Sequence, residues 1–434
     1  MANYSNQRNG AAGRNTGAGR NGGTAGRRGS QKKGTGKTVI FVVELVIVAL
    51  LVGVLVFTVK AFGGNGSSEG GDGDNGSFFS KLANTIGDAF GNGENSQPKG
   101  ISIVKLEEEK LEIPQEVKQN EVMKGYMNVA LFGVDISKES TNEKGETVLL
   151  PANSVRQSGL LKGYRSDTIM IASVNQDTGD IKLVSVYRDT FLNIGDSYSK
   201  CNAAYAKGGA EQAVKMLNTN LDMDIENFVT VSYWSLVGVI DALGGVELDI
   251  NDKELVHLNN YGVSIGKTMN TSFTPLAKTG HQRVNGMQAA AYCRIRYAGM
   301  GGLSNDFART ARQRAVLKAI ETQAKKSDLN SLLDAFNSVQ SDIYTSFQKD
   351  ELINLISHVW DYRIVEEEGS DNGFPQEEYR VGKNMGAKGS CIVPTDLETN
   401  VKWLHKYLFD EDDYNVSATV KENSKAIKTY SSKY

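Results

Sequence analysis

The chain has 434 residues, 40% of them hydrophobic and 23% charged, which is ample to bury a core as one large domain or two ordinary ones. Its three cysteines and four scattered histidines match neither a disulfide framework nor a zinc-binding pattern. The net charge is only −3, which excludes a generally basic nucleic-acid-binding body.

The first 37 residues form a basic tail. They contain eight lysines and arginines and no acidic residue, so the tail carries +8 and the remainder of the chain carries −11. This composition predicts a disordered segment near anionic lipid. The stretch KGTGKT resembles a phosphate-binding loop, but a strict match needs glycine at Gln31 and a preceding strand, so we favour the tail. DNA binding would depend on the charge of this tail alone, which gives only non-specific attraction.

An apolar run of 22 residues, 38–59, follows the tail and contains one charge, Glu44. As a helix it spans roughly 33 Å, about one bilayer core. Lys32, Lys33 and Lys37 precede it, so the positive-inside rule predicts a single-pass cell-membrane protein with a cytoplasmic N-terminus and an extracellular body. A cleaved signal peptide is the alternative, but this run is longer than a usual signal region and no clean cleavage site follows.

Residues 60–100 are rich in Gly, Ser, Asn and Asp, which predicts a flexible extracellular linker. Within this linker, four apolar residues between 79 and 90 have helical spacing. The spacing predicts either a short helix that rests on the membrane or the domain, or a transient helix. Residues 101–125 form a lead-in segment.

From residue 126 apolar strands alternate with helical stretches, which predicts an α/β domain over 126–420. Strands are predicted at 127–135, 167–175 and 181–189. Helices are predicted at 210–221, 234–243, 309–326, 329–339, 349–360 and 396–409. Residues 421–434 are predicted to be a frayed C-terminal tail.

The stretch 294–314 contains five arginines, although the chain as a whole is slightly acidic. Arg294 and Arg296 are two residues apart, so we expect them on one face of a strand. Arg314 is expected to be solvated. Like charges gathered at this density need a counter-ion.

The second half of this stretch has helical spacing. Arg309, Arg312 and Gln313 would share one face of a helix that begins near Asn305 or Asp306. Their polar turn would then lie at the helix end whose dipole favours anions. The spacing therefore predicts an anion site next to the core.

Four other polar groups lie where strands or helices begin or end: Asp135, Arg165 with Asp167, Arg188 with Asp189, and Lys200 with Asn202. Each alone has an ordinary structural explanation, such as an ion pair or a capped turn. Several arginines together suit a pyrophosphate, because each guanidinium can bind two oxygens. Two nearby aspartates suit a divalent cation. A metal and arginines together would stabilise a pyrophosphate leaving group.

The stretches NVALFGVD, GYRSDTIMIASVN, LVSVYRDT, CNAAYAKGGAEQAV, VGVIDALGGVELDI, VNGMQAAAYCRIR and DFARTARQR occur in this order between Asn128 and about Lys325. Together they resemble the LytR–CpsA–Psr family of bacterial cell-envelope proteins. The resemblance implies an α-β-α sandwich with a central mixed sheet and an apolar pocket for the tail of a polyprenyl-pyrophosphate-linked glycopolymer. It also implies transfer of that polymer, for example teichoic acid or capsule, to a peptidoglycan sugar hydroxyl, with release of the polyprenyl phosphate or pyrophosphate carrier.

The resemblance also assigns roles by position. Asp135 and Asp167 fall where the ligands of Mg²⁺ (or Mn²⁺) lie. Contacts to the pyrophosphate headgroup fall on Arg165, Arg188, Asn202, Arg294, Arg296, Arg309, Arg312 and Gln313, of which Asn202 and Arg312 match less closely. Catalysis falls on Arg188 together with Asp135 or Asp189, one of which would help to deprotonate the acceptor hydroxyl.

The chain departs from the family pattern in three places. Tyr187 stands where the family usually has proline, residues 136–164 form a long polar insertion, and extra glycines lengthen the segment 298–306. Two other functions would use the same residues: a regulatory or scaffold protein that binds the envelope lipid without transfer, and a hydrolase in which water replaces the sugar hydroxyl. The sequence leaves open whether Cys201 and Cys293 pair.

Overall fold

The computed structural model describes residues 102–134, 139–141, 147–149, 165–269, 271–300, 303, 305–327, 331, 335, 343–348, 351, 363–365 and 372–434. Among these residues, no helix is both long and apolar enough to cross a membrane. The predicted basic tail (1–37), membrane span (38–59) and linker (60–100) lie outside the described part of the chain. So do Asp135 and nearly all of the predicted helices at 329–339 and 349–360.

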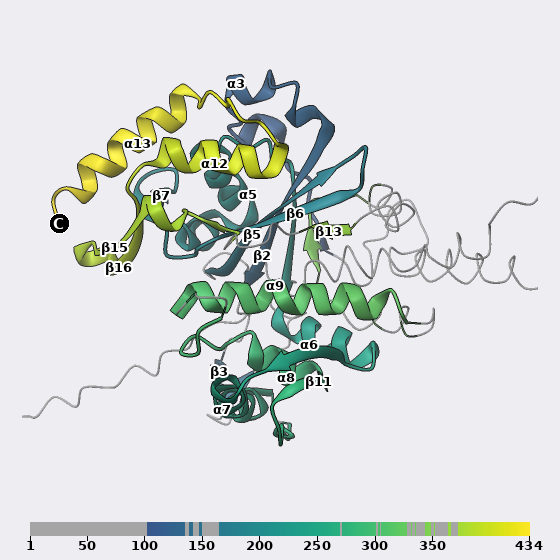
Figure 1. Ribbon diagram of the computed structural model, residues 1–434. Coiled ribbons are helices and arrows are strands. Elements are labelled where there is room, and N and C mark those ends of the chain that lie inside the picture. Colours follow the sequence, from purple (N-terminus) through teal and green to yellow (C-terminus); the bar gives the residue numbers. More distant parts are fainter. Residues whose placement is uncertain are drawn as a thin grey trace, which may run out of the picture. The chain divides into compact units, whose positions relative to one another are not determined.

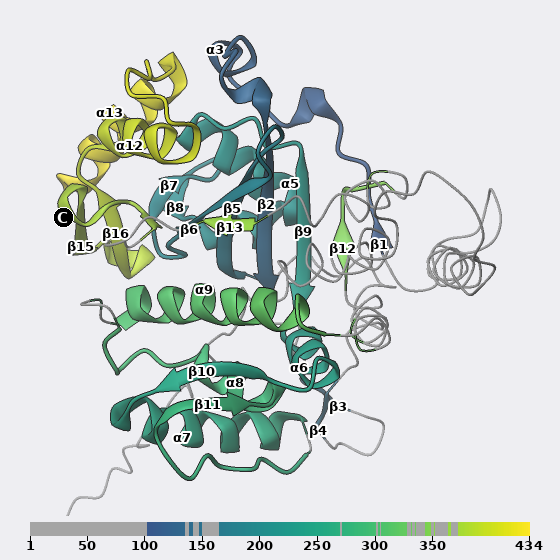
Figure 2. The same cartoon turned by 45° about the vertical axis from the view of Figure 1, so that its right-hand side comes forward.

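A mixed β-sheet forms the centre of the fold (Figures 1 and 2). Its middle strands are β9 (Asn227–Ser232), β2 (Tyr126–Val134), β5 (Ser166–Asn175) and β6 (Asp180–Val186). β2 runs parallel to β9 and antiparallel to β5, which is antiparallel to β6. The outer strands are β1 (Ser102–Ile103), β12 (Tyr344–Thr345), β13 (Arg363–Val365) and β14 (Gly373–Phe374). The three predicted strands and the α/β class are therefore confirmed.

Successive residues of β2 enter two different cores because side chains alternate across a strand. Ala130, Phe132 and Val134 join one core, and Val129 and Leu131 join the other. The first core is covered by α5 (Asn202–Leu221), α12 (Leu397–Phe409) and α13 (Ala418–Ser431). The second is covered by α6 (Tyr233–Ala242), α8 (Gly286–Tyr292) and α9 (Asn305–Ala324), with α7 (Asp252–Met269) packed on α8. Helices on both faces of the sheet give the expected α-β-α layers (Figure 2).

Short elements complete the described fold. Antiparallel pairs are formed by β7 (Phe191–Asn193) with β8 (Tyr198–Lys200), β10 (Val246–Ile250) with β11 (Gly280–Val284), and β15 (Arg380–Asn384) with β16 (Ser390–Pro394). Within the 136–164 insertion, β3 (Glu139–Thr141) pairs with β4 (Thr147–Leu149). The lead-in segment contains the short helix α3 (Gln115–Lys118).

The prediction of a frayed tail at 421–434 is wrong, because α13 runs through most of it. Ser417 caps this helix by accepting a hydrogen bond from the Val420 backbone at 3.1 Å. The Ser417 hydroxyl in turn donates to Asp222 at 2.5 Å, and Ile427 is buried in the core. The tail looked frayed because its few apolar residues are separated by lysines and serines, yet these few side chains are enough to dock one helical face.

The lead-in segment also belongs to the domain rather than preceding it. Leu111, Ile113, Val117 and Met123 are buried in the same core as α5 and α12. The folded domain therefore begins before residue 126 and extends past residue 420.

Candidate functional site

Four structural elements bring the predicted site residues together. Asp167 lies at the start of β5 and Arg188 just beyond the end of β6. Arg296 lies in the loop that follows α8, and Arg309 lies in the first turns of α9. Figure 1 shows α9 along the side of the sheet that also carries α6 and α8. The prediction that Arg294 and Arg296 lie on a strand is wrong, because α8 ends at Tyr292 and a turn follows.

We call Arg188, Arg296 and Arg309 the arginine cluster. Two aspartates connect its members: Arg188 Nη1 lies 2.5 Å from Asp167 Oδ1, and Arg309 Nη2 lies 2.9 Å from Asp306 Oδ2. Arg296 Nε lies 3.4 Å from the other oxygen of Asp306. Arg309 also reaches the backbone carbonyl of Asp167 at 3.4 Å. Among the described residues, these three guanidinium groups and Lys200 share the carboxylates of Asp167, Asp306 and Asp189, so one positive charge is left in excess.

Burial makes this excess charge costly. Burial, together with the neighbouring cations Arg188 and Arg296, lowers the pKa of Arg309 to about 10 against the opposing effect of Asp306. Burial also lowers the pKa of Arg296. For Arg188 burial acts in the same direction, but Asp167, Asp306 and Asp189 outweigh it and raise the pKa. All three side chains remain charged at neutral pH and attract an anion.

Several polar atoms of this region are buried without a hydrogen-bond partner among the described residues. The donors are Arg188 Nε, Arg296 Nη2, and Nε and Nη1 of Arg309, whose side chain is 1% exposed. The amide nitrogen and oxygen of Gln313 and the Oδ1 acceptor of Asn202 are also buried without a hydrogen-bond partner among these residues. Leaving a buried donor unsatisfied costs about 1–3 kcal/mol, so natural proteins rarely do this without a functional reason. These donors fit an anionic ligand with several oxygens.

Asp306 belongs to the site, although the sequence did not predict that its carboxylate binds the site arginines. It was considered only as the start of a helix, yet it pairs with two members of the arginine cluster. Its spacing from Arg309 gives the signal in retrospect, because residues three apart on a helix lie side by side. In the first turn of α9, Asp306 occupies a position that favours negative charge.

Asp189 lies at the edge of the arginine cluster. Its Oδ1 lies 3.0 Å from Nζ of Lys200, and its Oδ2 lies 3.9 Å from Nε of Arg188. The backbone N–H of Asn202 donates to the Arg188 carbonyl at 3.2 Å, which ties the start of α5 to this edge. The structure thus places Asp189, Lys200 and Asn202 beside Arg188.

Three predicted residues lie differently. Arg165 is exposed just before β5. Arg294 lies over the ring of Tyr261 on α7, with its Cζ 5.5 Å from the ring centroid. Arg314 is buried rather than solvated and donates to the Ser185 hydroxyl at 2.8 Å. Among the predicted headgroup arginines, Arg188, Arg296 and Arg309 form one network through Asp167 and Asp306.

Arg312 fills a structural position. Its Nε lies 2.9 Å from Glu254, and its two terminal nitrogens donate to the carbonyls of Ile295, Ala298 and Gly299. Its side chain is fully buried. Arg312 therefore fixes the loop that carries Arg296, and its guanidinium donates hydrogen bonds to protein groups rather than to a ligand.

We expect Arg312→Ala to lower the free energy of unfolding by about 3–5 kcal/mol, because it leaves Glu254 buried without its cation. Urea denaturation measures this loss. Arg283→Ala is the matched control, since Arg283 pairs with Glu247 at 2.9 Å on the surface, and its loss should cost under about 1 kcal/mol. Equal stability losses for the two variants would contradict this role of Arg312.

The cysteines do not form the disulfide that the sequence left open. Cys201, Cys293 and Cys391 are buried thiols. Cys201 and Cys293 belong to the two different cores, on opposite faces of the sheet. Cys201 donates to the carbonyl of Tyr187 at 3.2 Å, and burial raises its pKa, so the thiol stays protonated and structural.

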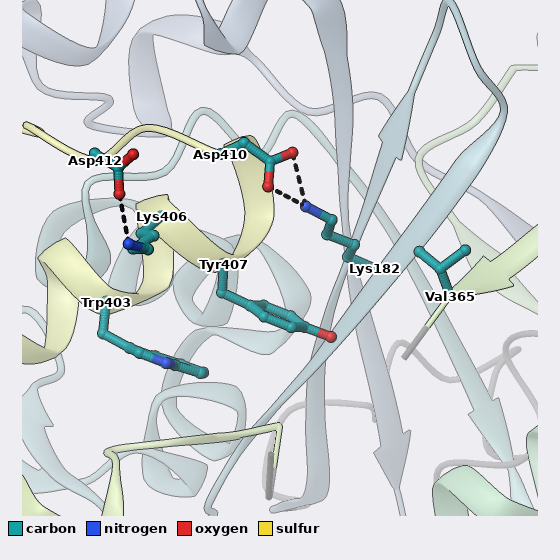
Figure 3. Close-up of a pocket in the computed structure, with 7 residues that line it drawn as sticks. All are labelled: Lys182, Val365, Trp403, Lys406, Tyr407, Asp410 and Asp412. Atoms are coloured by element: carbon teal, nitrogen blue, oxygen red, sulfur yellow. Dashed lines mark hydrogen bonds and ion pairs between the residues drawn. The ribbon is translucent and has the colours of Figure 1, made fainter. Parts of the chain in front are cut away.

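A groove of about 520 Å³ lies elsewhere, between α12 and strands β6 and β13 (Figure 3). Its lining includes Lys182, Trp403, Lys406, Tyr407, Asp410 and Asp412. The charged groups pair with one another, Lys182 with Asp410 at 2.9 Å and Lys406 with Asp412 at 2.5 Å. With two cations matched by two anions, this groove lacks the excess positive charge of the arginine cluster.

The comparisons with known proteins agree with the resemblance. The LytR_cpsA_psr family profile matches residues 96–368. The polyisoprenyl-teichoic acid–peptidoglycan teichoic acid transferase TagU of Bacillus mycoides is 31% identical over 226 residues, which cover 51% of this chain and 67% of that protein. The TagU of Enterococcus faecalis is 27% identical over 256 residues, which cover 56% and 77%.

Solved structures are more distant. A structure of TagT bound to LIIa-WTA has a TM-score of 0.49 and 19% identity, with 71% of this chain and 98% of that chain covered. The TagT structure with bound octaprenyl pyrophosphate lipid has a TM-score of 0.46 and 19% identity, with 71% and 99% covered.

Proposed function

The chain belongs to the LytR–CpsA–Psr family, and we propose that it transfers an anionic glycopolymer from a polyprenyl-pyrophosphate carrier to a sugar hydroxyl of peptidoglycan. The observation that carries this proposal is the buried arginine cluster, which retains several N–H groups without a hydrogen-bond partner among the described residues. The oxygens of a pyrophosphate would satisfy such donors. The TagU relatives are named for this transfer of teichoic acid to peptidoglycan. Family and site chemistry therefore point to one reaction.

In this reaction the acceptor hydroxyl oxygen forms a bond to the phosphorus on the glycan side of the pyrophosphate. The bond between that phosphorus and the bridging oxygen breaks, and polyprenyl phosphate leaves with the negative charge. Arg188, Arg296 and Arg309 would bind the phosphate oxygens and stabilise the charge that develops on the leaving group. Because these arginines are fixed by Asp167 and Asp306 before the ligand arrives, little reorganisation is needed.

A carboxylate would accept the proton of the acceptor hydroxyl. Asp189 is the candidate within the described residues, since it lies at the edge of the arginine cluster and its side chain is 28% exposed. Lys200 Nζ pairs with it at 3.0 Å. Asp135, the other candidate base, lies outside the described part of the chain.

The donor set suits a hard divalent cation such as Mg²⁺. Carboxylate oxygens are what this ion prefers, and Asp167 presents its carboxylate next to Arg188. Asp167 together with Asp135 would hold the metal, which supplies further neutralisation of pyrophosphate charge when bound. No group of three or more potential ligand side chains occurs among the described residues. Phosphate oxygens and water commonly complete the shell of Mg²⁺.

The location proposed for this chemistry is the outer surface of the cell membrane. The support is the 22-residue apolar run at 38–59, with three lysines just before it. A protease added to intact cells should then digest the folded domain and spare the basic tail. A folded domain that stays intact in whole cells but is digested after lysis would contradict this orientation.

The proposed activity is tested with the full-length chain, Mg²⁺, a short-chain lipid-pyrophosphate saccharide and peptidoglycan oligomers. Mass spectrometry should detect a phosphodiester-linked conjugate whose formation requires Mg²⁺. Released saccharide phosphate without conjugate would instead support the hydrolase, and bound but intact lipid would support the regulatory or scaffold protein. Arg363→Ala, which removes an exposed arginine at the far end of β6, is the control that should leave the conjugate yield unchanged.

A further inference from the structure

The segment that follows the family match reaches the arginine cluster. The match ends at residue 368, and β14 (Gly373–Phe374) then pairs in parallel with the last residues of β6. The Tyr187 backbone N–H donates to the Phe374 carbonyl at 3.0 Å. Because Tyr187 directly precedes Arg188, residues that follow the family match help to hold the strand end that carries a site arginine.

Arg380 in this segment covers two aromatic rings. Its Cζ lies 3.9 Å from the ring centroid of Phe307 and 4.9 Å from that of Tyr187. The two rings contact each other edge to face, with centroids 4.5 Å apart. Arg380 Nη1 donates to the Pro375 carbonyl at 2.7 Å, which anchors the guanidinium within its own segment. The guanidinium of Arg380 thus lies over two aromatic rings that contact each other edge to face, and we call these three side chains the Arg380 stack.

Both rings adjoin residues of the arginine network. Tyr187 precedes Arg188, and Phe307 stands between Asp306 and Arg309 at the start of α9. The stack therefore ties the end of β6 to the first turn of α9. These are the two elements whose arginines repel each other. The contacts of Arg380 therefore add to those of Asp167 and Asp306 in holding the two elements together.

The side chain of Tyr187 fits against a glycine of the segment that follows the family match. A Cβ atom placed on Gly373 would lie 1.9 Å from the Tyr187 hydroxyl oxygen, so only glycine leaves room for the buried tyrosine. Tyr187 is fully buried. The tyrosine that stands where the family usually has proline thus has partners in Gly373 and Arg380, both of which follow the family match.

We propose that Arg380 is a positioning residue for the arginine cluster, holding Arg188 and Arg309 at the spacing that a pyrophosphate requires. This role of Arg380 rests on the proposed function only for the identity of the reaction. The affinity for a pyrophosphate tests the role of Arg380 whether or not the chain transfers a glycopolymer. Arg380 touches the rings of Phe307 and Tyr187 and is not itself a catalytic residue.

The test compares Arg380→Ala and Arg380→Lys in the full-length chain, with Arg363→Ala as the control. For Arg380→Ala we expect the affinity for farnesyl pyrophosphate and the kcat of transfer each to fall about tenfold. Both are measured at a temperature well below the unfolding temperature of the variant. Arg380→Lys should recover part of this loss because the ammonium keeps a cation over the rings. Arg363→Ala should behave as the unmodified chain, since Arg363 is an exposed side chain that pairs with Asp180 on the surface.

A double-mutant cycle with Phe307→Leu separates positioning from a general loss of stability. If Arg380 acts through the Phe307 ring, Arg380→Ala should have little further effect on affinity once the ring is gone. If Arg380 is merely structural, its removal lowers the unfolding temperature while kcat and affinity of the folded protein stay unchanged, and the proposal is overturned. If the unmodified chain binds farnesyl pyrophosphate but makes no conjugate, the transfer reaction fails while the affinity data still decide the role of Arg380.

Discussion

Replacing Arg188 with alanine is expected to lower kcat/KM for transfer by about 10²- to 10³-fold, the usual effect of removing one group that stabilises developing charge. Arg188 joins the site through Asp167 at 2.5 Å and has an Nε without a hydrogen-bond partner among the described residues. Steady-state kinetics with varied donor measure the loss. Circular dichroism of the same sample checks that the fold is intact.

Arg188→Lys refines this prediction. Lysine keeps the charge but lacks the planar fork that binds two oxygens at once, so we expect an activity between those of alanine and arginine. Arg363→Ala serves again as the control, because it removes the same side chain from a surface pair. Turnover by Arg188→Ala at the unmodified rate would remove Arg188 from the site.

Replacing Asp306 with asparagine is expected to lower the free energy of unfolding by about 1–3 kcal/mol in the absence of ligand. The change keeps the shape of the side chain but removes the charge that compensates Arg309 at 2.9 Å and Arg296 at 3.4 Å. A pyrophosphate can supply the missing negative charge. The rise in melting temperature on adding farnesyl pyrophosphate should therefore be larger in Asp306→Asn than in the unmodified chain.

Asp410→Asn is the control for this experiment. Asp410 pairs with Lys182 at 2.9 Å on the surface, so its replacement should change stability by under about 1 kcal/mol and leave the ligand-induced shift unaltered. A ligand-induced shift in Asp306→Asn that is no larger than in the unmodified chain would show that the bound pyrophosphate does not compensate the charge lost with Asp306.

The sequence predicted the sheet and the long helix of the site because their patterns are local. Apolar runs with strand propensity identified β2, β5 and β6, and the spacing of Arg309 and Gln313 identified α9. The C-terminal helix α13 was missed because its stability comes from contacts with α5 and α12, not from its own hydrophilic sequence.

For the site, residue types and order predicted which charges gather but not how they pair. Arg188, Arg296 and Arg309 do form one network, whereas Arg312 is bound by Glu254 and three carbonyls from the preceding loop. Such a pairing joins residues 58 positions apart, and periodicity within one element says nothing about it. The stack of Arg380 on Phe307 and Tyr187 is invisible to the sequence for the same reason.

The most direct test of the central claim is calorimetric titration of the full-length chain and of Arg309→Ala with farnesyl pyrophosphate and farnesyl monophosphate. If the arginine cluster is the pyrophosphate site, the unmodified chain should bind the pyrophosphate at least tenfold more tightly than the monophosphate. Arg309→Ala should lose that preference, because the buried Nε and Nη1 would no longer be available to the second phosphate. A preference that is equally strong in Arg309→Ala would place the pyrophosphate elsewhere and contradict the account.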